Sequence, residues 1–168
     1  MPAERRTLRL AAVLGALAVG AVLTGCTAPA ASTCPPGLVE TANAKATENG
    51  MNLAFSAAAV GDFEPAALQS WIQSACVIAF TGDLGSGTAV GHFAFTTEDI
   101  DEPAFALAVN QLGYDGENGT WAKQDATTGE ADVITASAPS ADGGSIVDLS
   151  QAFPEAKLVI SSFHFTGS

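Results

Sequence analysis

The sequence has very few positive charges outside its first nine residues. Arginine occurs only at positions 5, 6 and 9, and the rest of the chain carries three lysines, Lys45, Lys123 and Lys157. Proteins that bind nucleic acids use lysine and arginine to neutralise phosphates. The guanidinium group of arginine is also the usual group that binds phosphate or carboxylate through two hydrogen bonds. We therefore expect no nucleic-acid partner.

The residue patterns of common catalytic and cofactor sites are also missing. Ser86 lacks the Gly-x-Ser-x-Gly frame of a nucleophilic serine. The glycine-rich stretch 82–87 lacks the lysine and the following helix that a phosphate loop requires, so it predicts a hairpin turn. The acidic stretch 115–119 departs from the calcium-loop pattern, because glycine stands at its fifth position and threonine follows. We predict no catalytic residue, no cofactor and no enzymatic activity.

A long apolar run occurs only near the start of the chain. Arg5, Arg6 and Arg9 precede an uncharged stretch from Leu10 to Leu23. As a helix of about 14 residues it would span roughly 21 Å, which is short of the roughly 30 Å hydrocarbon core of a bilayer. This layout is typical of a removable export signal.

The run ends in Leu23, Thr24, Gly25 and Cys26, a motif that resembles the lipobox of bacterial lipoproteins. The resemblance covers residues 1–30. It implies that Leu23, Thr24 and Gly25 are recognised by the signal peptidase, that cleavage makes Cys26 the new N-terminus, and that the Cys26 thiol carries membrane lipid. It also implies a protein that is anchored on the extracytoplasmic face of the cell membrane. The alternatives are an ordinary secretory signal with an incidental Cys26, or an uncleaved anchor.

Cleavage before Cys26 would leave 143 residues with 17 acids, three lysines and a formal charge of −14. We predict a lipidated linker over 26–36 and a single domain over 37–168. Cations, basic peptides and basic surfaces are the electrostatically reasonable partners. Cys34 and Cys76 are the remaining cysteines, and in an oxidising exported location they are expected to form a disulfide, with two separate buried thiols as the alternative.

Hydrophobic periodicity predicts an α+β fold, with a mostly antiparallel sheet and two or three helices packed on one face. Residues 37–60 stay open between a helix reaching Ala46 and a strand around Met51 to Phe55. A short helix is expected after Pro65, and a second one around Phe105. The expected strands are 76–80, 88–96, 120–122, 131–137, 145–149 and 157–166.

Both histidines of the mature chain lie among phenylalanines. If the surrounding stretches are strands, His92 and His164 point away from the face that carries the phenylalanines. On neighbouring strands the two imidazoles could bind zinc or copper together with an acid, and the simpler interpretation is two solvent-side residues. The expected core packs Phe105, Val109 and Leu112 of the second helix against the sheet residues Phe93, Phe95, Phe163 and Phe165.

These observations favour a membrane-anchored, non-catalytic module that binds a protein, peptide or cell-wall ligand, or that is structural. The alternative is a cation- or metal-binding lipoprotein, for which His92 and His164 are the candidate ligands. An enzyme is the third and least favoured class.

Overall fold

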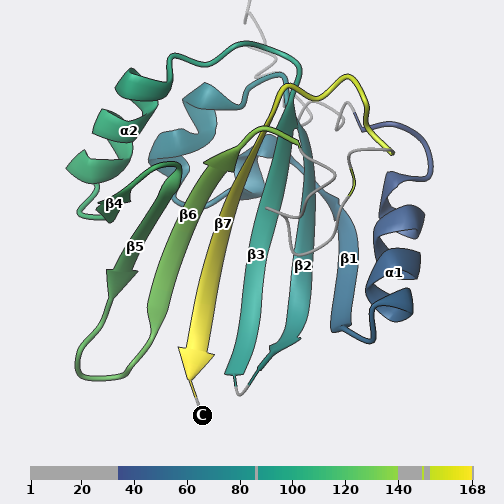
Figure 1. Cartoon of the computed structure of the whole chain (residues 1–168), viewed down its shortest axis with the longest axis horizontal. Helices are drawn as coiled ribbons and strands as arrows, with labels where there is room; N and C mark the ends of the chain where they lie inside the picture. Colours follow the sequence, from purple (N-terminus) through teal and green to yellow (C-terminus); the bar gives the residue numbers. More distant parts are fainter. Residues whose placement is uncertain (1–33, 86, 140–148, 150–151, 168) are drawn as a thin grey trace, which may run out of the picture.

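Within residues 34–85, 87–139, 149 and 152–167, which a computed structural model describes, seven strands form one antiparallel sheet (Figure 1). The strand order is β1-β2-β3-β7-β6-β5-β4, so the last strand lies in the middle, between β3 and β6. This confirms the α+β class and the antiparallel sheet. The strands are β1 (Asn52–Ala58), β2 (Cys76–Leu84), β3 (Gly87–Thr96), β4 (Asp115–Glu117), β5 (Thr120–Gln124), β6 (Ala131–Ser137) and β7 (Leu158–Gly167).

Two α-helices and two short 3₁₀ helices accompany the sheet. Helix α1 (Leu38–Glu48) is followed directly by β1, so the helical and the extended patterns of residues 37–60 both occur, one after the other. The helix expected after Pro65 is present as a 3₁₀ helix, η2 (Ala66–Trp71), and a shorter 3₁₀ turn, η1 (Val60–Asp62), precedes it.

Helix α2 (Glu102–Gln111) begins and ends as its sequence predicts. The Asp101 carboxylate accepts a hydrogen bond from the Ala104 N–H at 3.1 Å, which satisfies a free donor of the first turn. Gly113 adopts the left-handed conformation with φ +85°, and Tyr114 packs into the core beside the helix.

The alternation of side chains gives the sheet two different faces. One face carries Phe55, Phe80, Phe93 and Phe163, whose rings form a connected cluster with centroids 5.2 to 6.2 Å apart. We call it the phenylalanine face. The opposite side, the histidine face, carries the residues that alternate with these, including His92 and His164.

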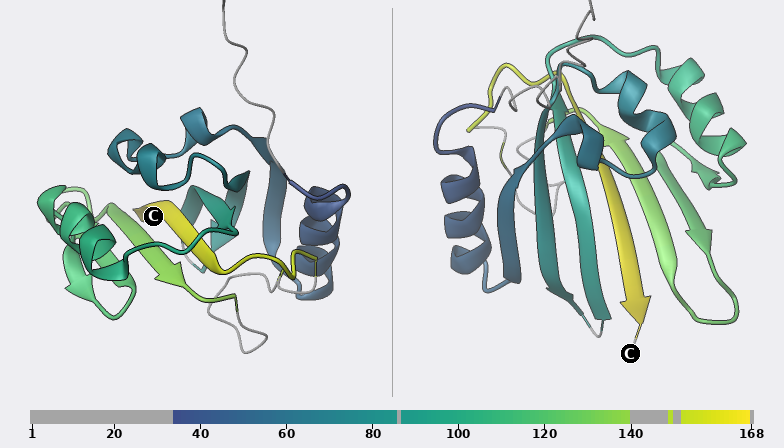
Figure 2. Two further views of the ribbon diagram at one scale, coloured as in Figure 1. Left: turned by 90° about the horizontal axis from the view of Figure 1, so that it is seen from above. Right: turned by 180° about the vertical axis from the view of Figure 1, so that it is seen from behind.

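The helices are divided between these faces, whereas the sequence led us to expect them on one. Leu38, Ala42 and Ala46 of α1 belong to the cluster of the phenylalanine face. Phe105 of α2 and Leu68 of η2 belong to a second cluster on the histidine face. In the right-hand view of Figure 2, which looks at the sheet from behind, the 3₁₀ turns lie in front of the strands, on the side that faces away from the viewer in Figure 1.

The expected packing of Phe105, Val109 and Leu112 against Phe93, Phe95, Phe163 and Phe165 was therefore wrong. Phe105 and Val109 instead share a cluster with other sheet residues, namely Val77, Ala94, Trp121, Ile134, Leu158 and Ile160. The physical reason is that the sheet is buried on both sides at this end, so apolar residues stand at consecutive positions of β2, β3 and β7.

Helix α1 lies along the outer edge of β1 and is tied to it by one side chain. The Asn43 amide donates to the Phe55 carbonyl at 3.0 Å, and the Phe55 N–H donates to the Asn43 amide oxygen at 2.9 Å. This pair of bonds imitates a neighbouring strand and covers part of an edge that would otherwise be open.

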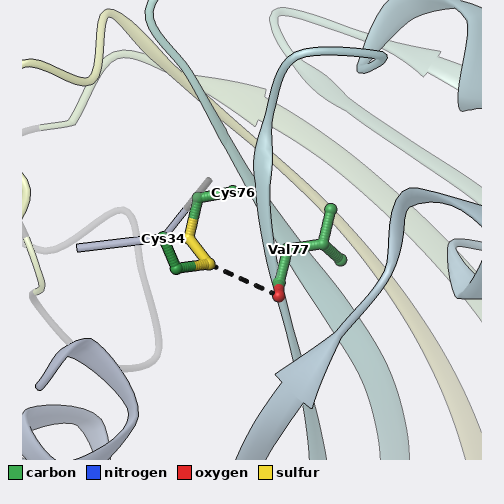
Figure 3. The surroundings of a disulfide bond; sticks show 3 residues. All are labelled: Cys34, Cys76 and Val77. Atoms are coloured by element: carbon green, nitrogen blue, oxygen red, sulfur yellow. Dashed lines mark hydrogen bonds between the residues drawn. A yellow bond between two sulfur atoms is a disulfide. The ribbon is translucent and has the colours of Figure 1, made fainter. Parts of the chain in front are cut away.

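A disulfide joins Cys34 to Cys76, as predicted (Figure 3). It ties the segment before α1 to the first residue of β2. The Cys34 sulfur also lies 3.7 Å from the Val77 carbonyl oxygen, a contact and not a hydrogen bond, because a disulfide sulfur has no proton to donate.

Other predicted features lie outside the described residues. These are the signal residues Leu23, Thr24 and Gly25, the lipidation site Cys26, and the expected strand 145–149 apart from Leu149. In the part of the chain that the structure describes, no helix is long and apolar enough to cross a membrane.

Candidate binding site on the histidine face

The histidine face is covered only in part. Figure 2 shows that the 3₁₀ turns and α2 cover one end of the sheet, while the strands toward the β2–β3 turn are left bare. At the boundary lies a recess of about 570 Å³, which is within the usual size range of ligand sites. We call it the sheet recess. Its lining combines strand residues of β1, β2, β3, β6 and β7 with Glu64, Pro65 and Tyr114.

His92 and His164 both line the sheet recess, on neighbouring strands. His92 of β3 stands opposite Ser162 of β7, and His164 stands opposite Val90, so the two histidines are diagonal neighbours. The prediction that they share the face away from the phenylalanines is confirmed.

Gly91, beside His92, sets the close fit of β3 against β7. A Cβ at this position would lie 2.1 Å from the Ser162 carbonyl oxygen and 2.9 Å from Phe80 Cε1. Both separations are shorter than real contacts allow. The missing side chain thus lets the two central strands and the Phe80 ring meet directly behind the recess.

His164 is held by the acid opposite it on β6. Its Nδ1 lies 2.7 Å from Asp132 Oδ1, with both side chains a little over two-fifths exposed. An ionised carboxylate only accepts hydrogen bonds, so Nδ1 carries the proton in this pair. Nε2 is then the ring atom left for solvent or a ligand.

His92 is half-buried and packs against the Phe63 ring, with centroids 5.9 Å apart. Burial lowers the pKa of His92 from its ordinary value, although the nearby carboxylates of Asp62 and Glu64 oppose this effect. The imidazole is therefore mainly uncharged at neutral pH. Among the described residues it has no hydrogen-bond partner.

The Tyr114 hydroxyl is a second polar group that lacks a hydrogen-bond partner among the described residues. Its side chain is only 8% exposed, and burial together with Asp132 and Glu64 raises its pKa. The hydroxyl makes no hydrogen bond within the described residues. Among the described residues, the side-chain polar atoms that are both fully enclosed and without a partner include only Trp121 Nε1, so the unpartnered Tyr114 hydroxyl keeps contact with solvent. A buried polar group that is left without a protein partner usually bonds water or a ligand.

The charge of the lining is negative. Glu64 and Asp132 contribute carboxylates, and none of the described lining residues is a lysine or arginine. The floor is partly apolar, with Val90 43% exposed between polar neighbours. Such a surface attracts cations and repels anions.

The metal hypothesis for His92 and His164 receives no support from this geometry. Among the described residues, no three histidine, cysteine, aspartate or glutamate side chains converge closely enough to hold a metal ion. A hydrolytic arrangement is not formed by these two histidines either. In the same part of the chain, His164 bonds only Asp132, and neither imidazole is hydrogen-bonded to a serine or cysteine.

A separate hollow of about 390 Å³ lies between α2 and the β4–β5 hairpin. Trp121 lines it, but its indole N–H is fully enclosed and has no acceptor among the residues that the structure describes. The indole packs edge-on against Phe105, with centroids 5.8 Å apart. Because a ligand could not reach this N–H without a rearrangement, we place the functional site in the sheet recess.

Sequence reasoning found the two histidines and missed Glu64, Tyr114 and Asp132. Asp132 lies on β6, whereas Glu64 lies between η1 and η2 and Tyr114 lies between α2 and β4, so the three meet only through contacts between distant segments. Comparison of the chain with family models, curated proteins and solved structures finds no match.

Proposed function

We propose that this protein is a lipid-anchored, non-catalytic binding module on the extracytoplasmic face of the cell membrane, and that the sheet recess holds a positively charged group of its protein, peptide or cell-wall ligand. The anchor rests on the lipobox-like motif that ends at Cys26. The ligand class rests on the chemistry of the recess.

The Tyr114 hydroxyl is the observation that carries the proposal. Tyr114 is almost buried, and its neutral hydroxyl has no hydrogen-bond partner among the described residues, while the carboxylates of Asp132 and Glu64 act on it electrostatically. An ammonium group can be attracted by both acids while it donates a hydrogen bond to the hydroxyl oxygen. The uncharged imidazole of His92 offers a further acceptor without adding a competing positive charge.

The tether would keep this site close to the bilayer. Cys34 follows Cys26 by eight residues and is fixed to β2 by the disulfide. Eight extended residues reach at most roughly 25 to 30 Å. A ligand at the membrane surface is therefore within reach of the recess.

The test of the binding site uses protein extracted from membranes in a non-ionic detergent. Backbone amide NMR shifts are followed while N-acetyl-lysine amide is added, and the neutral side-chain-acetylated form serves as the control ligand. We expect shifts at Tyr114, Asp132 and the strand residues of the sheet recess with the charged probe alone. Equal shifts with the neutral probe, or shifts elsewhere only, would overturn the proposal.

Two matched variants distinguish binding by the recess carboxylates from attraction by the net negative charge of the protein. Glu64→Gln removes one recess charge from an exposed position, and we expect it to weaken binding of the charged probe by about twofold to fivefold at low salt, consistent with about 0.4 to 1 kcal/mol for an exposed ion pair. Glu48→Gln removes the same charge from an exposed position on α1 and should leave the affinity unchanged. Equal losses in both variants would indicate attraction by net charge alone.

Titration with calcium, zinc and copper distinguishes the cation- or metal-binding alternative. Heat release and a raised melting temperature with one of these ions would favour that alternative. The present proposal predicts neither.

The anchor is tested independently of the ligand. Cys26→Ala should block incorporation of radiolabelled palmitate, because the thioether to lipid requires a thiol. Palmitate that still enters the variant would contradict lipidation at Cys26.

A further inference from the structure

A second hollow adjoins the sheet recess. It has a volume of about 440 Å³, is formed by β5, the β5–β6 turn and β6, and shares Asp132 and His164 with the recess. The two hollows therefore meet at this hydrogen-bonded pair. Together they form a groove across the bare part of the histidine face, from β1 to β5.

The far end of this groove is acidic as well. Asp125 and Glu130 line the second hollow, and Lys123 is the one lysine among its described lining residues. The Asp125 carboxylate accepts hydrogen bonds from the N–H groups of Thr127 and Thr128, at 2.7 and 3.2 Å, and these bonds lower its pKa. Asp125 therefore stays ionised through the physiological pH range, so negative charge lies at both ends of the groove.

The dimensions of the groove suit a chain of several residues. Five strand spacings of about 4.8 Å separate β1 from β5 in the sheet order, which gives roughly 24 Å. An extended peptide covers this distance with about seven residues. A single small amine would occupy one acidic end and leave the other empty.

We propose that the occupant of the groove is an extended basic peptide segment. This inference rests on the proposed function and names its ligand. One basic side chain lies in the sheet recess near Glu64 and Tyr114, and a second, several residues along, lies beside Glu130 in the second hollow. The His164–Asp132 pair at the junction offers Nε2 and the free carboxylate oxygen to the peptide backbone between them.

Three capped probes test the inference by calorimetry on the detergent-extracted protein. They are N-acetyl-lysine amide, a heptapeptide with lysine at its first position and alanine elsewhere, and a heptapeptide with lysine at both ends. The doubly charged peptide is expected to bind at least tenfold more tightly than the singly charged one. Glu130→Gln should reduce this gain to about twofold and leave the affinity for N-acetyl-lysine amide unchanged.

The possible failures are distinguishable. If N-acetyl-lysine amide binds in the recess and the two heptapeptides bind equally well, the extended peptide is wrong and the proposed function stands. If the affinity advantage of the doubly charged peptide persists in Glu130→Gln and disappears in Glu48→Gln, the second lysine of the peptide binds outside the second hollow, and the inference is overturned. If none of the probes binds, the proposed function falls and this inference with it.

Discussion

At the level of single residues, His92 makes folding depend on pH. Its pKa is lowered by burial, so on acidification the unfolded chain takes up a proton before the folded chain does. The free energy of unfolding must then fall as the pH is lowered through the ordinary histidine range, near 6.5, toward the depressed value. We predict that His92→Gln flattens this decline, as measured by urea unfolding between pH 7.5 and 5.5.

His164 is present in both proteins of that comparison, so the difference between them reports on His92. A variant that loses stability on acidification as steeply as the wild type would contradict the burial of the neutral imidazole.

The core prediction also belongs to the residue scale. Phe95 is 3% exposed and contacts the rings of Phe93 and Phe153. Phe95→Ala should lower the free energy of unfolding by about 3 to 5 kcal/mol, because it removes buried area and leaves a cavity. Leu107→Ala, at a side chain that is 59% exposed on α2, should cost roughly 0.5 kcal/mol or less. Similar losses in the two variants, measured by chemical denaturation, would refute the assignment of the core.

The sequence predicted which residues share a face better than it predicted the site. Strand alternation has a period of two, so the separation of His92 and His164 from the phenylalanines followed from spacing alone. Tyr114 and Glu64 carried no such signal. Glu64 precedes η2 and Tyr114 follows α2. Helix capping and turn formation fully explain the local sequence around each.

At the level of elements, the attachment of α1 to the edge of β1 depends on Asn43. Asn43→Ala removes both bonds to the Phe55 backbone and leaves a donor and an acceptor beside an apolar helix face. We predict a loss of about 1 to 3 kcal/mol in the free energy of unfolding. Thr47→Ala is the control, because among the described residues the Thr47 hydroxyl bonds only the Asn43 carbonyl, within the same helix. Equal stability of the two variants would show that the Asn43 side-chain amide does not stabilise the attachment of α1 to β1.

Most elements were predictable, and the packing of the helices was not. Helix α2 has an acidic cap, an early proline and a left-handed glycine after its end, and these local signals locate it without tertiary information. The sidedness of the helices depends on β2, β3 and β7, each of which has one end where consecutive residues are buried. A strand that is buried on both faces does not indicate which helix covers which side.

At the level of the whole molecule, the disulfide ties the N-terminal segment to the sheet. Cys34 and Cys76 are 42 residues apart, and a closed loop of this size stabilises a fold by about 4 kcal/mol in the chain-entropy model. Replacing both cysteines with serine should lower the free energy of unfolding by an amount of this order. Reduction of the wild type should lower its stability similarly, and alkylation of unreduced, denatured protein should label neither residue. Stoichiometric labelling of either cysteine would contradict the bond.

The strand order is the part of the fold that local sequence signals left undetermined. Hairpins join neighbours along the chain, but β7 enters between β3 and β6 only through contacts between distant segments. This insertion places His164 opposite Asp132 and next to the strand of His92. The sheet recess therefore depends on the strand order, and no local motif in the sequence predicts it.

The central claim is that a ligand cation uses the Tyr114 hydroxyl, and Tyr114→Phe tests it most directly. The hydroxyl has no hydrogen-bond partner in the part of the chain that the structure describes, so its removal should change the free energy of unfolding by less than about 0.5 kcal/mol. The affinity for the doubly charged heptapeptide, measured by calorimetry on the same two proteins, should fall by about threefold to tenfold, the value of one hydrogen bond. Unchanged affinity together with unchanged stability would contradict the account, because the hydroxyl would then serve neither the fold nor the ligand.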